Sequence, residues 1–522
     1  MNGDLRIVNA RIFTANDAMP WAESLLITRG RIDWIGNGEA PQREGAETID
    51  LDGRLVLPGL TDAHVHFYWY ARTLANVDLA GVASLEQALS MLSAAVRERK
   101  PGEWVVGDSY DHNIWGLKRE LDKRDLDAIA PDHPVVVTSK CGHTVWANSM
   151  AMALAGVDRD TPEPPGSRIE RDAQGEPSGL FREEAMGLMY AAIPPLDRET
   201  GKRLLRKAMQ RAHAFGLTGI HNCERSESLS LLAELARDGE LTLRVLQHYS
   251  EGNFDAAVAL GVNSGFGSDY LRMGGLKLFI DGALGVQTAL MDEPFCGSED
   301  TGIQTMPEER LRELVHRAAA HGIGATVHAI GDKANRMVLD IMESAAAIDP
   351  KLRHRIEHAQ LLTDADVIRF AELGVTASMQ PTHLLGDMDL VDKYWGPRGR
   401  LAYAFGSVLR SGGRLAFGSD CPVETMDPVL AIHAAVSRQR IDGQPEGGFY
   451  PEEKISVAEA VKAYTSGPAY AGGQEADLGS LEVGKFGDLV VLDKDIFALP
   501  ENEIHSARPV LTVVGGTVRY RV

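Results

Sequence analysis

Residues 55–66 read LVLPGLTDAHVH, an apolar run that ends in two histidines one residue apart. On an extended strand, side chains two positions apart point to the same side, so His64 and His66 are expected to aim both imidazoles at one point. Two neighbouring imidazole nitrogens suit Zn²⁺ or a similar metal ion. The His-x-His pair is weak evidence by itself, because it also occurs by chance, and its interpretation depends on the rest of the chain.

The composition is that of an ordinary soluble protein, with 44% hydrophobic and 24% charged residues among 522. The net charge of −21 argues against a nucleic-acid partner or an anionic membrane, because both attract basic surfaces. The N-terminus lacks the features of a signal peptide, and no segment approaches about 20 uninterrupted apolar residues. The four cysteines are far apart and form no CxxC pair, so a reducing cytoplasm is predicted and disulfides are not.

Short alternating strands are predicted at both ends of the chain, within residues 1–57 and 475–522. Neither end has enough strands for a stable sheet of its own. We therefore expect both ends to join in one small β-sandwich.

Strands alternate with helices in residues 58–474, which predicts parallel strands joined by helical crossovers. One strand ends at His64 and His66, and seven more are predicted at 214–224, 242–249, 274–281, 324–330, 354–360, 375–381 and 414–420. Eight such units predict an α/β fold of the (β/α)₈ TIM-barrel type, with its active site at the carboxyl ends of the strands. Residues 68–205 break the alternation and are expected to form an inserted α/β subdomain at the barrel mouth.

Four further metal-capable residues stand near the carboxyl ends of the later strands: Lys277, His328, His358 and Asp420. A lysine inside an apolar strand is unusual, because burying an ammonium group is costly. Considered alone, Lys277 allows two interpretations. It could form a buried ion pair with Asp281 or Asp332, or its amine could have reacted with CO₂ to give an anionic carbamate that bridges two metals.

Together these motifs resemble the amidohydrolase superfamily in its binuclear subtype. Within it they resemble the amidohydrolase-3 branch, which includes YtcJ-like proteins and N-substituted formamide deformylases. The six ligand positions occur in the order of the family. The shared motifs are PGLTDAHVH at 58–66, KLFIDGALG at 277–285, HAIGD at 328–332, QPT at 380–382, GSD at 418–420 and GSLEVGKFGDL at 479–489.

The resemblance implies two divalent metal ions, with zinc expected and Mn²⁺ or Fe²⁺ as alternatives. The implied ligands are His64, His66, carboxylated Lys277, His328, His358 and Asp420. It also implies that a metal-activated hydroxide cleaves a non-peptide C–N bond (amide, N-substituted formamide or carbamate) of a small, fairly apolar molecule. Asp420 is then expected to accept the proton of the attacking water and to deliver it to the leaving amine.

Three alternatives remain open: ester or lactone hydrolysis, deamination, and a catalytically silent scaffold. Deaminases of this superfamily usually lack the bridging lysine and use His-x-x-Glu, whereas here Lys277 is present and Gly331 stands three residues after His328. Silent scaffolds typically lose ligands, and none of the six is missing. A homodimer is expected because it is the commonest assembly of soluble proteins.

The candidate substrate-binding residues are His143, His221, Gln287, Tyr110, Trp115 and Cys421. Both histidines could instead be structural, and both aromatic residues could belong to the core of the insertion. Gln287 stands where the branch often has arginine, so we expect a substrate without a carboxylate at that position. Cys421 replaces a tryptophan that is common in the branch, which would widen the pocket.

A few residues beside the predicted ligands are weaker candidates. Asp62 and Asp281 could orient an imidazole or a loop, although a turn or cap role fits equally well. Strand alternation directs Glu357 away from the site. His112 and His383 are the weakest candidates for the pocket.

Overall fold

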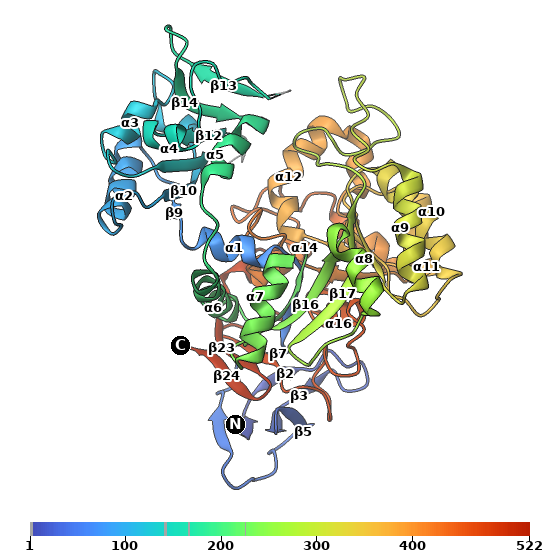
Figure 1. Cartoon of the computed structure of the whole chain (residues 1–522). Helices are drawn as coiled ribbons and strands as arrows, with labels where there is room; N and C mark the ends of the chain where they lie inside the picture. Colours follow the sequence, from blue (N-terminus) through green and yellow to red (C-terminus); the bar gives the residue numbers. More distant parts are fainter. Residues whose placement is uncertain (1–3, 140–143, 165–166, 225) are drawn as a thin grey trace. The chain divides into compact units, whose positions relative to one another are not determined.

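The computed structural model describes residues 4–139, 144–164, 167–224 and 226–522. It divides into two compact units (Figure 1). Unit 1 comprises Met1–Tyr68 and Arg206–Val522, and unit 2 comprises Trp69–Leu205. In the described part of the chain, no helix is both long and apolar enough to cross a membrane.

The centre of unit 1 is a sheet of eight parallel strands in the order β21-β20-β19-β18-β17-β16-β15-β8. The strands are β8 (Leu60–Val65), β15 (Leu217–Asn222), β16 (Arg244–Ser250), β17 (Leu271–Phe279), β18 (Ala325–Ala329), β19 (Arg355–His358), β20 (Thr376–Met379) and β21 (Arg414–Phe417). A parallel bridge between Val65 and Cys421 brings the last strand back to the first. The sheet is therefore a nearly closed barrel, and the predicted (β/α)₈ architecture is confirmed.

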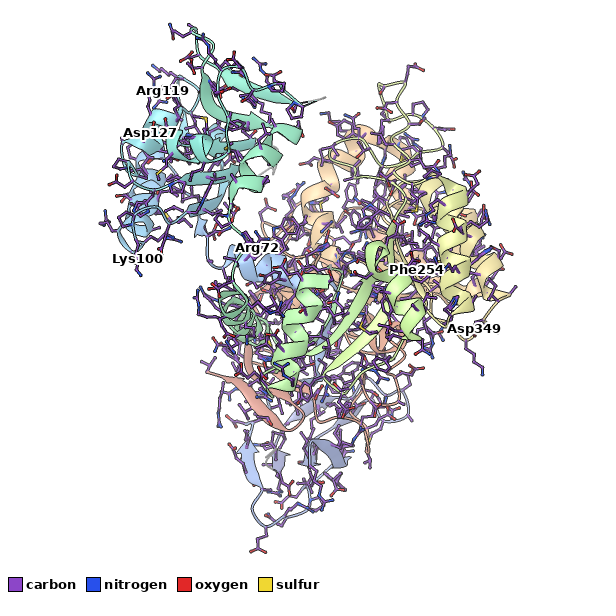
Figure 2. The ribbon with its side chains drawn as sticks, in the orientation of Figure 1. Arg72, Lys100, Arg119, Asp127, Phe254 and Asp349 are labelled. Carbon is purple, nitrogen blue, oxygen red and sulfur yellow. The ribbon has the colours of Figure 1, made fainter. Side chains whose placement is uncertain are left out.

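Helices connect the strands of the barrel. After β8 comes α1 (Phe67–Thr73), and the helices that precede or join the later strands are α6 (Arg198–Ala214), α7 (Ser226–Arg237), α8 (Glu251–Leu260), α9 (Glu308–Ala320), α10 (Asp332–Ala346), α11 (Asp364–Leu373), α12 (Pro381–Tyr394) and α13 (Phe405–Arg410). The last strand, β21, is followed by α14 (Pro428–Ser437), α15 (Val457–Ala463) and α16 (Ser466–Ala471). There are also 3₁₀ turns at Gly396–Leu401, Pro451–Glu453 and Glu501–Ser506. In α11 the Thr363 side chain accepts the N–H of Asp366 at the start, and Gly374 ends the helix with a φ of 65°. Phe254 of α8 is buried (Figure 2).

The two ends of the chain pair in a six-stranded sheet, as predicted. The expectation that neither end forms a sheet of its own is wrong, because four N-terminal strands form one. A four-stranded sheet has the order β5 (Arg31–Gly36), β4 (Ser24–Thr28), β1 (Leu5–Val8) and β6 (Glu47–Asp50). A six-stranded sheet has the order β24 (Thr517–Arg521), β23 (Pro509–Val514), β22 (Leu489–Leu492), β7 (Leu55–Pro58), β2 (Arg11–Phe13) and β3 (Trp21–Ala22). β22 from the C-terminal end pairs antiparallel with β7 from the N-terminal end. One hydrophobic cluster, which includes Leu25, Ile27 and Val491, joins both sheets.

Unit 2 is an α/β unit with a sheet of its own. Its strand order is β13 (Arg168–Arg171), β14 (Pro177–Arg182), β12 (Thr144–Ala147), β11 (Val135–Ser139), β10 (Val105–Tyr110) and β9 (Val77–Asp78). Its helices are α2 (Leu85–Arg97), α3 (Lys123–Asp127), α4 (Ser149–Leu154) and α5 (Met186–Ala192), with 3₁₀ turns at His112–Trp115 and Glu183–Ala185. Charged side chains such as Lys100 and Arg119 are exposed on its surface (Figure 2).

Candidate metal centre

Two histidines of β8 and its end meet the aspartate that follows β21. His64 Nε2 lies 3.4 Å from Asp420 Oδ1, and His66 Nε2 lies 3.3 Å from the same oxygen. These three side chains bring their ligand atoms within 4.8 Å of one another. The strands that carry them are adjacent because the barrel closes between Val65 and Cys421. Parallel strands thus place residues from the two ends of the barrel sequence at one point.

Two of the predicted ligands reach the centre through left-handed backbone conformations. His358 has a φ of 71° and Asp420 has a φ of 57°. Such values are uncommon for residues other than glycine and often mark functional sites. At His358 the turn ends the regular alternation of β19, so its imidazole reaches the other histidines, with its ring centroid 5.0 Å from that of His64 and 4.5 Å from that of His328.

The prediction that Glu357 points away from the site is wrong, because the left-handed backbone at His358 interrupts the alternation of β19. Because His358 leaves the alternation, Arg355 and Glu357 are the β19 residues that face the barrel interior, and both are fully buried. The Glu357 carboxylate accepts a short hydrogen bond from His64 Nδ1. Glu357 therefore orients a predicted metal ligand, since a carboxylate on one ring nitrogen directs the other nitrogen toward the metal.

Arg355 links this carboxylate to the rest of the barrel interior. Its Nε donates to Glu357 Oε1 at 2.5 Å, and its Nη2 donates to Ser378 Oγ at 2.6 Å. Its Nη1 donates to His221 Nδ1 at 2.7 Å. Burial raises the pKa of Glu357, but Arg355 and His64 outweigh it and hold that pKa well below its usual value. Buried hydrogen bonds therefore connect His221 through Arg355 and Glu357 to His64.

His328 and His358 each have a hydrogen bond that fixes the ring. His328 Nε2 lies 2.9 Å from the carbonyl oxygen of Gly282, and His358 Nδ1 lies 2.8 Å from Gln380 Oε1. Each ring therefore keeps its other nitrogen available for a metal. Burial lowers the pKa of both histidines, to about 3 for His328, which keeps their nitrogen lone pairs unprotonated.

Lys277 on β17 is buried, with 5% of its surface exposed. Among the described residues its Nζ has no hydrogen-bond partner, and it lies 4.2 Å from the centre of the Phe279 ring. The alternative of an ion pair with Asp281 is not supported, because that carboxylate accepts the N–H groups of Leu290 and Gly331 at 2.9 Å. Burial lowers the pKa of Lys277 and favours its neutral amine.

Two buried carboxylates, Asp62 and Asp281, hold the backbone of loops around the predicted ligands. Asp62 accepts the N–H groups of His64 at 3.1 Å and Ser419 at 3.0 Å, and so connects β8 to the loop after β21. Asp281 holds the loop after β17 against the loop after β18 through the N–H groups named above. Burial raises the pKa of both carboxyl groups to about 7. These contacts agree with the predicted roles in orienting a loop.

Asp420 lies close to His64 and His66, and the surrounding side chains change the pKa of its carboxyl group. Burial raises its pKa, but the hydrogen bond with His66 and the electrostatic effect of the neighbouring histidines outweigh this and lower it below the usual value. Asp420 is therefore ionised in its surroundings.

His383, the weak sequence candidate, lies beside the centre. It sits in the first turn of α12, and its Nε2 is 3.7 Å from Asp420 Oδ2. The three residues His358, His383 and Asp420 form a second group with ligand atoms within 4.8 Å of one another. A signal for His383 existed in the sequence, because it follows the QPT motif at the carboxyl end of β20.

The candidate substrate residues are dispersed. His143 lies outside the described residues. His221 is buried against Arg355, and Cys421 is buried with its carbonyl oxygen accepting the His66 N–H at 2.9 Å. Gln287 is half-buried in the loop after β17, where its N–H donates to Leu284.

Tyr110 and Trp115 belong to the hydrophobic core of unit 2, which is the alternative that the sequence left open. Their ring centroids are 6.0 Å apart, and Trp115 Nε1 donates to the carbonyl oxygen of Val82 at 2.7 Å.

Comparison with known proteins gives matches over almost the whole chain. The family model described as "Amidohydrolase family" matches residues 47–520. Protein LONG AFTER FAR-RED 3 of Arabidopsis thaliana is 34% identical over 99% of this chain and 91% of its own length. The N-substituted formamide deformylase of Arthrobacter pascens is 29% identical over 99% of this chain and 98% of its own.

A solved structure has the same fold. It is that of an uncharacterized metal-dependent hydrolase from Pyrococcus furiosus, which is 30% identical, with a TM-score of 0.80 over 95% of this chain and 100% of the other. These matches confirm the resemblance inferred from the motifs.

Proposed function

The chain belongs to the amidohydrolase family, and we propose that it is a metal-dependent hydrolase that cleaves a non-peptide C–N bond of a small, fairly apolar molecule. The observation that carries this proposal is the convergence of His64, His66, His358 and Asp420 at the carboxyl ends of barrel strands, with His328 in ring contact. Neutral imidazoles and an ionised carboxylate together form a donor set suited to Zn²⁺ and similar ions.

Lys277 supports the presence of two ions rather than one. A buried ammonium without a partner is costly, whereas a neutral amine can react with CO₂ to give a carbamate. The carbamate oxygens would satisfy the buried position and bind two metals. The residues therefore fit a binuclear centre with His64, His66 and Asp420 at one ion, His328 and His358 at the other, and carboxylated Lys277 between them.

Bound divalent ions would lower the pKa of a water molecule and polarise the carbonyl group under attack. The chain itself supplies the proton transfers and the positioning. One oxygen of the Asp420 carboxylate would accept the proton of the attacking water and later deliver it to the leaving amine. His383 Nε2 faces the same carboxylate, so it is placed to bind the carbonyl oxygen or the amine of the substrate. Glu357 and Gln380 hold His64 and His358 in their binding orientation.

Two observations favour an uncharged amide-type substrate. The relative from Arthrobacter pascens is named an N-substituted formamide deformylase and aligns over the whole chain. By the resemblance, Gln287 stands where the branch often has an arginine that would bind a carboxylate, and its loop follows β17, which carries Lys277. We therefore place an N-substituted formamide first, with other amides and carbamates next, and ester or lactone cleavage as the second candidate.

A matched panel of substrates tests this proposal. The zinc-loaded protein is incubated with a formamide, an acetamide and a methyl carbamate of one arylalkyl amine, the formate ester of the corresponding alcohol, and the formamide with a carboxylate added. Release of the amine or alcohol is measured by chromatography. We expect the neutral formamide to be cleaved fastest, and Asp420→Asn to lower its rate by about 10²–10⁴-fold.

Three results would overturn parts of this account. Cleavage of the ester alone would replace amide by ester hydrolysis, and a preference for the acidic formamide would contradict the argument from Gln287. Equal rates for the wild type and the Asp420→Asn variant would contradict the assigned role of this carboxylate.

A further inference from the structure

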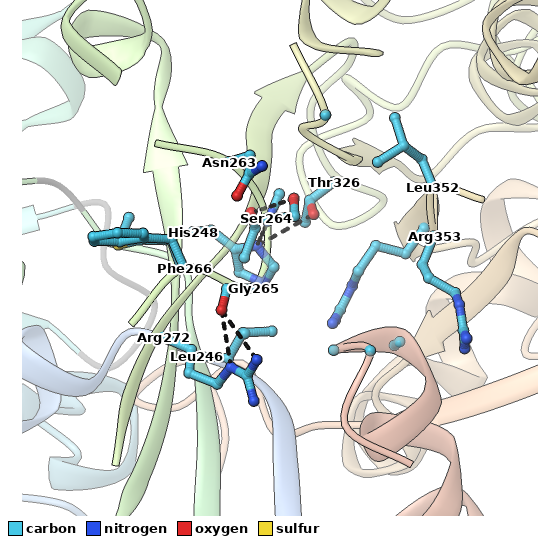
Figure 3. Close-up of a pocket in the computed structure, with 18 of the residues that line it drawn as sticks. Leu246, His248, Asn263, Ser264, Gly265, Phe266, Arg272, Thr326, Leu352 and Arg353 are labelled. Atoms are coloured by element: carbon cyan, nitrogen blue, oxygen red, sulfur yellow. Dashed lines mark hydrogen bonds between the residues drawn. The ribbon is translucent and has the colours of Figure 1, made fainter. Parts of the chain in front are cut away.

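A cavity of about 470 Å³ lies at the amino ends of β16 to β19, the end of the barrel away from the predicted metal ligands (Figure 3). It is lined by residues 263–266, 322 and 351–353, from the loops that lead into β17, β18 and β19, and by residues 471–473 at the end of α16. Strand residues Leu246, His248, Thr326 and Arg355 form further parts of its wall. None of the six predicted ligands lines it. Its volume falls within the usual range of small-molecule sites.

The cavity departs from the ordinary packing of such barrels, whose interiors are filled by side chains. Gly274 and Gly275 of β17 contribute no side chain to this wall. A Cβ atom at Gly274 would lie 2.8 Å from His248 Nδ1, and one at Gly275 would lie 2.6 Å from Thr326 Oγ1. Glycine is therefore required here for His248 and Thr326 to occupy the wall.

The charge of the lining is opposite to that of the protein. Four basic residues, Arg272, Lys351, Arg353 and Arg355, line the cavity, and none of the described lining residues is acidic, in a chain whose net charge is −21. Arg353 and Arg355 have carboxylate partners in Glu475 and Glu357.

The other two basic side chains, Arg272 and Lys351, have no carboxylate partner among the described residues. Among the described residues, the Arg272 guanidinium donates only to the carbonyl oxygen of Gly265, at 3.0 and 3.2 Å (Figure 3). Lys351 is exposed. Two cations of this wall are therefore left for an anion from outside the chain.

His248 contributes its ring to the same wall. It is 3% exposed, and its Nδ1 accepts the N–H of Gly275 at 3.0 Å. Because Nδ1 is an acceptor, the proton of the neutral ring is on Nε2. Among the described residues, Nε2 has no hydrogen-bond partner. Nε2 is itself buried with almost no accessible surface, so this N–H does not face the cavity, and the ring meets the other wall residues through Nδ1.

We propose that this cavity binds a small organic oxyanion. Arg272 and Lys351 supply the positive charge, and the described lining holds no acidic residue to oppose it. Leu246, Leu352 and the 60% exposed ring of Phe266 offer apolar surface for the body of the ligand. The shared chemistry is an oxyanion on an apolar body, and either a carboxylate or a phosphate ester provides it.

Arg355 places this site next to the network of the metal centre. It lines the cavity, and its guanidinium donates to Glu357, which accepts from His64 Nδ1. The inference does not depend on the proposed hydrolase activity, because it rests on residues outside that centre.

Isothermal titration calorimetry on the full-length, zinc-loaded protein tests the proposal. The probes are benzoate, phenyl phosphate, inorganic phosphate and benzamide, the last of which has the shape of benzoate without its charge. We expect benzoate or phenyl phosphate to bind at least about tenfold more tightly than benzamide, since a charge-assisted hydrogen bond contributes this much. Whichever of the two binds more tightly identifies the head group, and binding of inorganic phosphate alone would contradict the apolar part of the site.

Variants distinguish this cavity from the metal centre, where an anion can also bind. Arg272→Met and Lys351→Met should each weaken binding by about tenfold or more. The matched control is Arg99→Met, because Arg99 in unit 2 also donates to backbone carbonyl oxygens, those of Ala75 and Ala95. Lys351 is exposed, so its variant is expected to fold even where Arg272→Met does not. Anion affinity that is unchanged in Lys351→Met and in a folded Arg272→Met would overturn the proposal.

Discussion

Replacing Glu357 with glutamine should weaken metal binding although Glu357 is not itself a predicted ligand. In the wild type its carboxylate accepts from His64 Nδ1 on one side and from Arg355 on the other. A glutamine amide has one acceptor oxygen and one NH₂ group. If the oxygen accepts from His64, the NH₂ group faces the guanidinium, and two donors then oppose each other.

The magnitude follows from the burial of the pair. Loss of an orienting partner typically lowers metal affinity by 10- to 100-fold, which is about 1.4–2.8 kcal/mol. Arg355 loses its carboxylate while fully buried, which typically costs about 3–5 kcal/mol of folding stability. Its remaining hydrogen bonds to Ser378 and to the carbonyl oxygen of Ala63 favour the lower end of that range.

The assay is competition for zinc against a chromophoric chelator, with urea unfolding of the metal-free protein in parallel. Glu453→Gln is the matched control, because Glu453 is also a buried carboxylate and pairs with Arg410 away from the metal centre. The control should lose stability and keep its zinc affinity. Zinc affinity that is equal in Glu357→Gln and the wild type would refute the role assigned to Glu357.

Two further substitutions test other parts of the structure. Gly418→Ala would place a Cβ atom 2.4 Å from the backbone nitrogen of His64, so we expect about 1–3 kcal/mol of destabilisation and weaker zinc binding. The control Gly187→Ala has no atom within 4 Å of its Cβ and lies in α5, so it should keep its zinc affinity and lose no stability. Burial lowers the pKa of His213 from 6.5 to about 4, so the folded state binds fewer protons than the unfolded state below pH 6.5. The contribution of His213 is therefore constant above about pH 7 and falls as the pH drops toward 4, by about 2 kcal/mol at pH 5. Urea unfolding of the wild type and of His213→Gln at pH 7 and pH 5 should show this loss of stability only in the wild type. An equal pH dependence in the two proteins would contradict the role assigned to His213.

The barrel and the positions of the predicted ligands could be anticipated because each depends on local pattern and order. Apolar runs that end in His64, His328 and Asp420 recur along the chain, and parallel strands bring such ends together. The small number of strands at the C-terminal end predicted their pairing with the N-terminal end, although the N-terminal strands also form a four-stranded sheet of their own. A lysine inside an apolar strand allowed either an ion pair or a carbamate, and the family motifs favoured the carbamate.

The orientation of Glu357 could not be predicted, because it depends on the backbone of its neighbour. His358 adopts a left-handed conformation without the glycine that would announce it in the sequence. Counting by twos from His358 therefore assigns the wrong face to Glu357. His383 was undervalued for a related reason, since only the immediate start of α12 after β20 brings it to Asp420.

The central claim is that six side chains, including a carboxylated lysine, hold two metal ions, and metal content per folded chain tests it most directly. Protein saturated with zinc in bicarbonate buffer and then desalted is analysed by inductively coupled plasma mass spectrometry, for the wild type and for Lys277→Met. We expect about two zinc ions per wild-type chain and at most one in the variant. One ion or none in the wild type, or two retained in Lys277→Met, would contradict the binuclear centre.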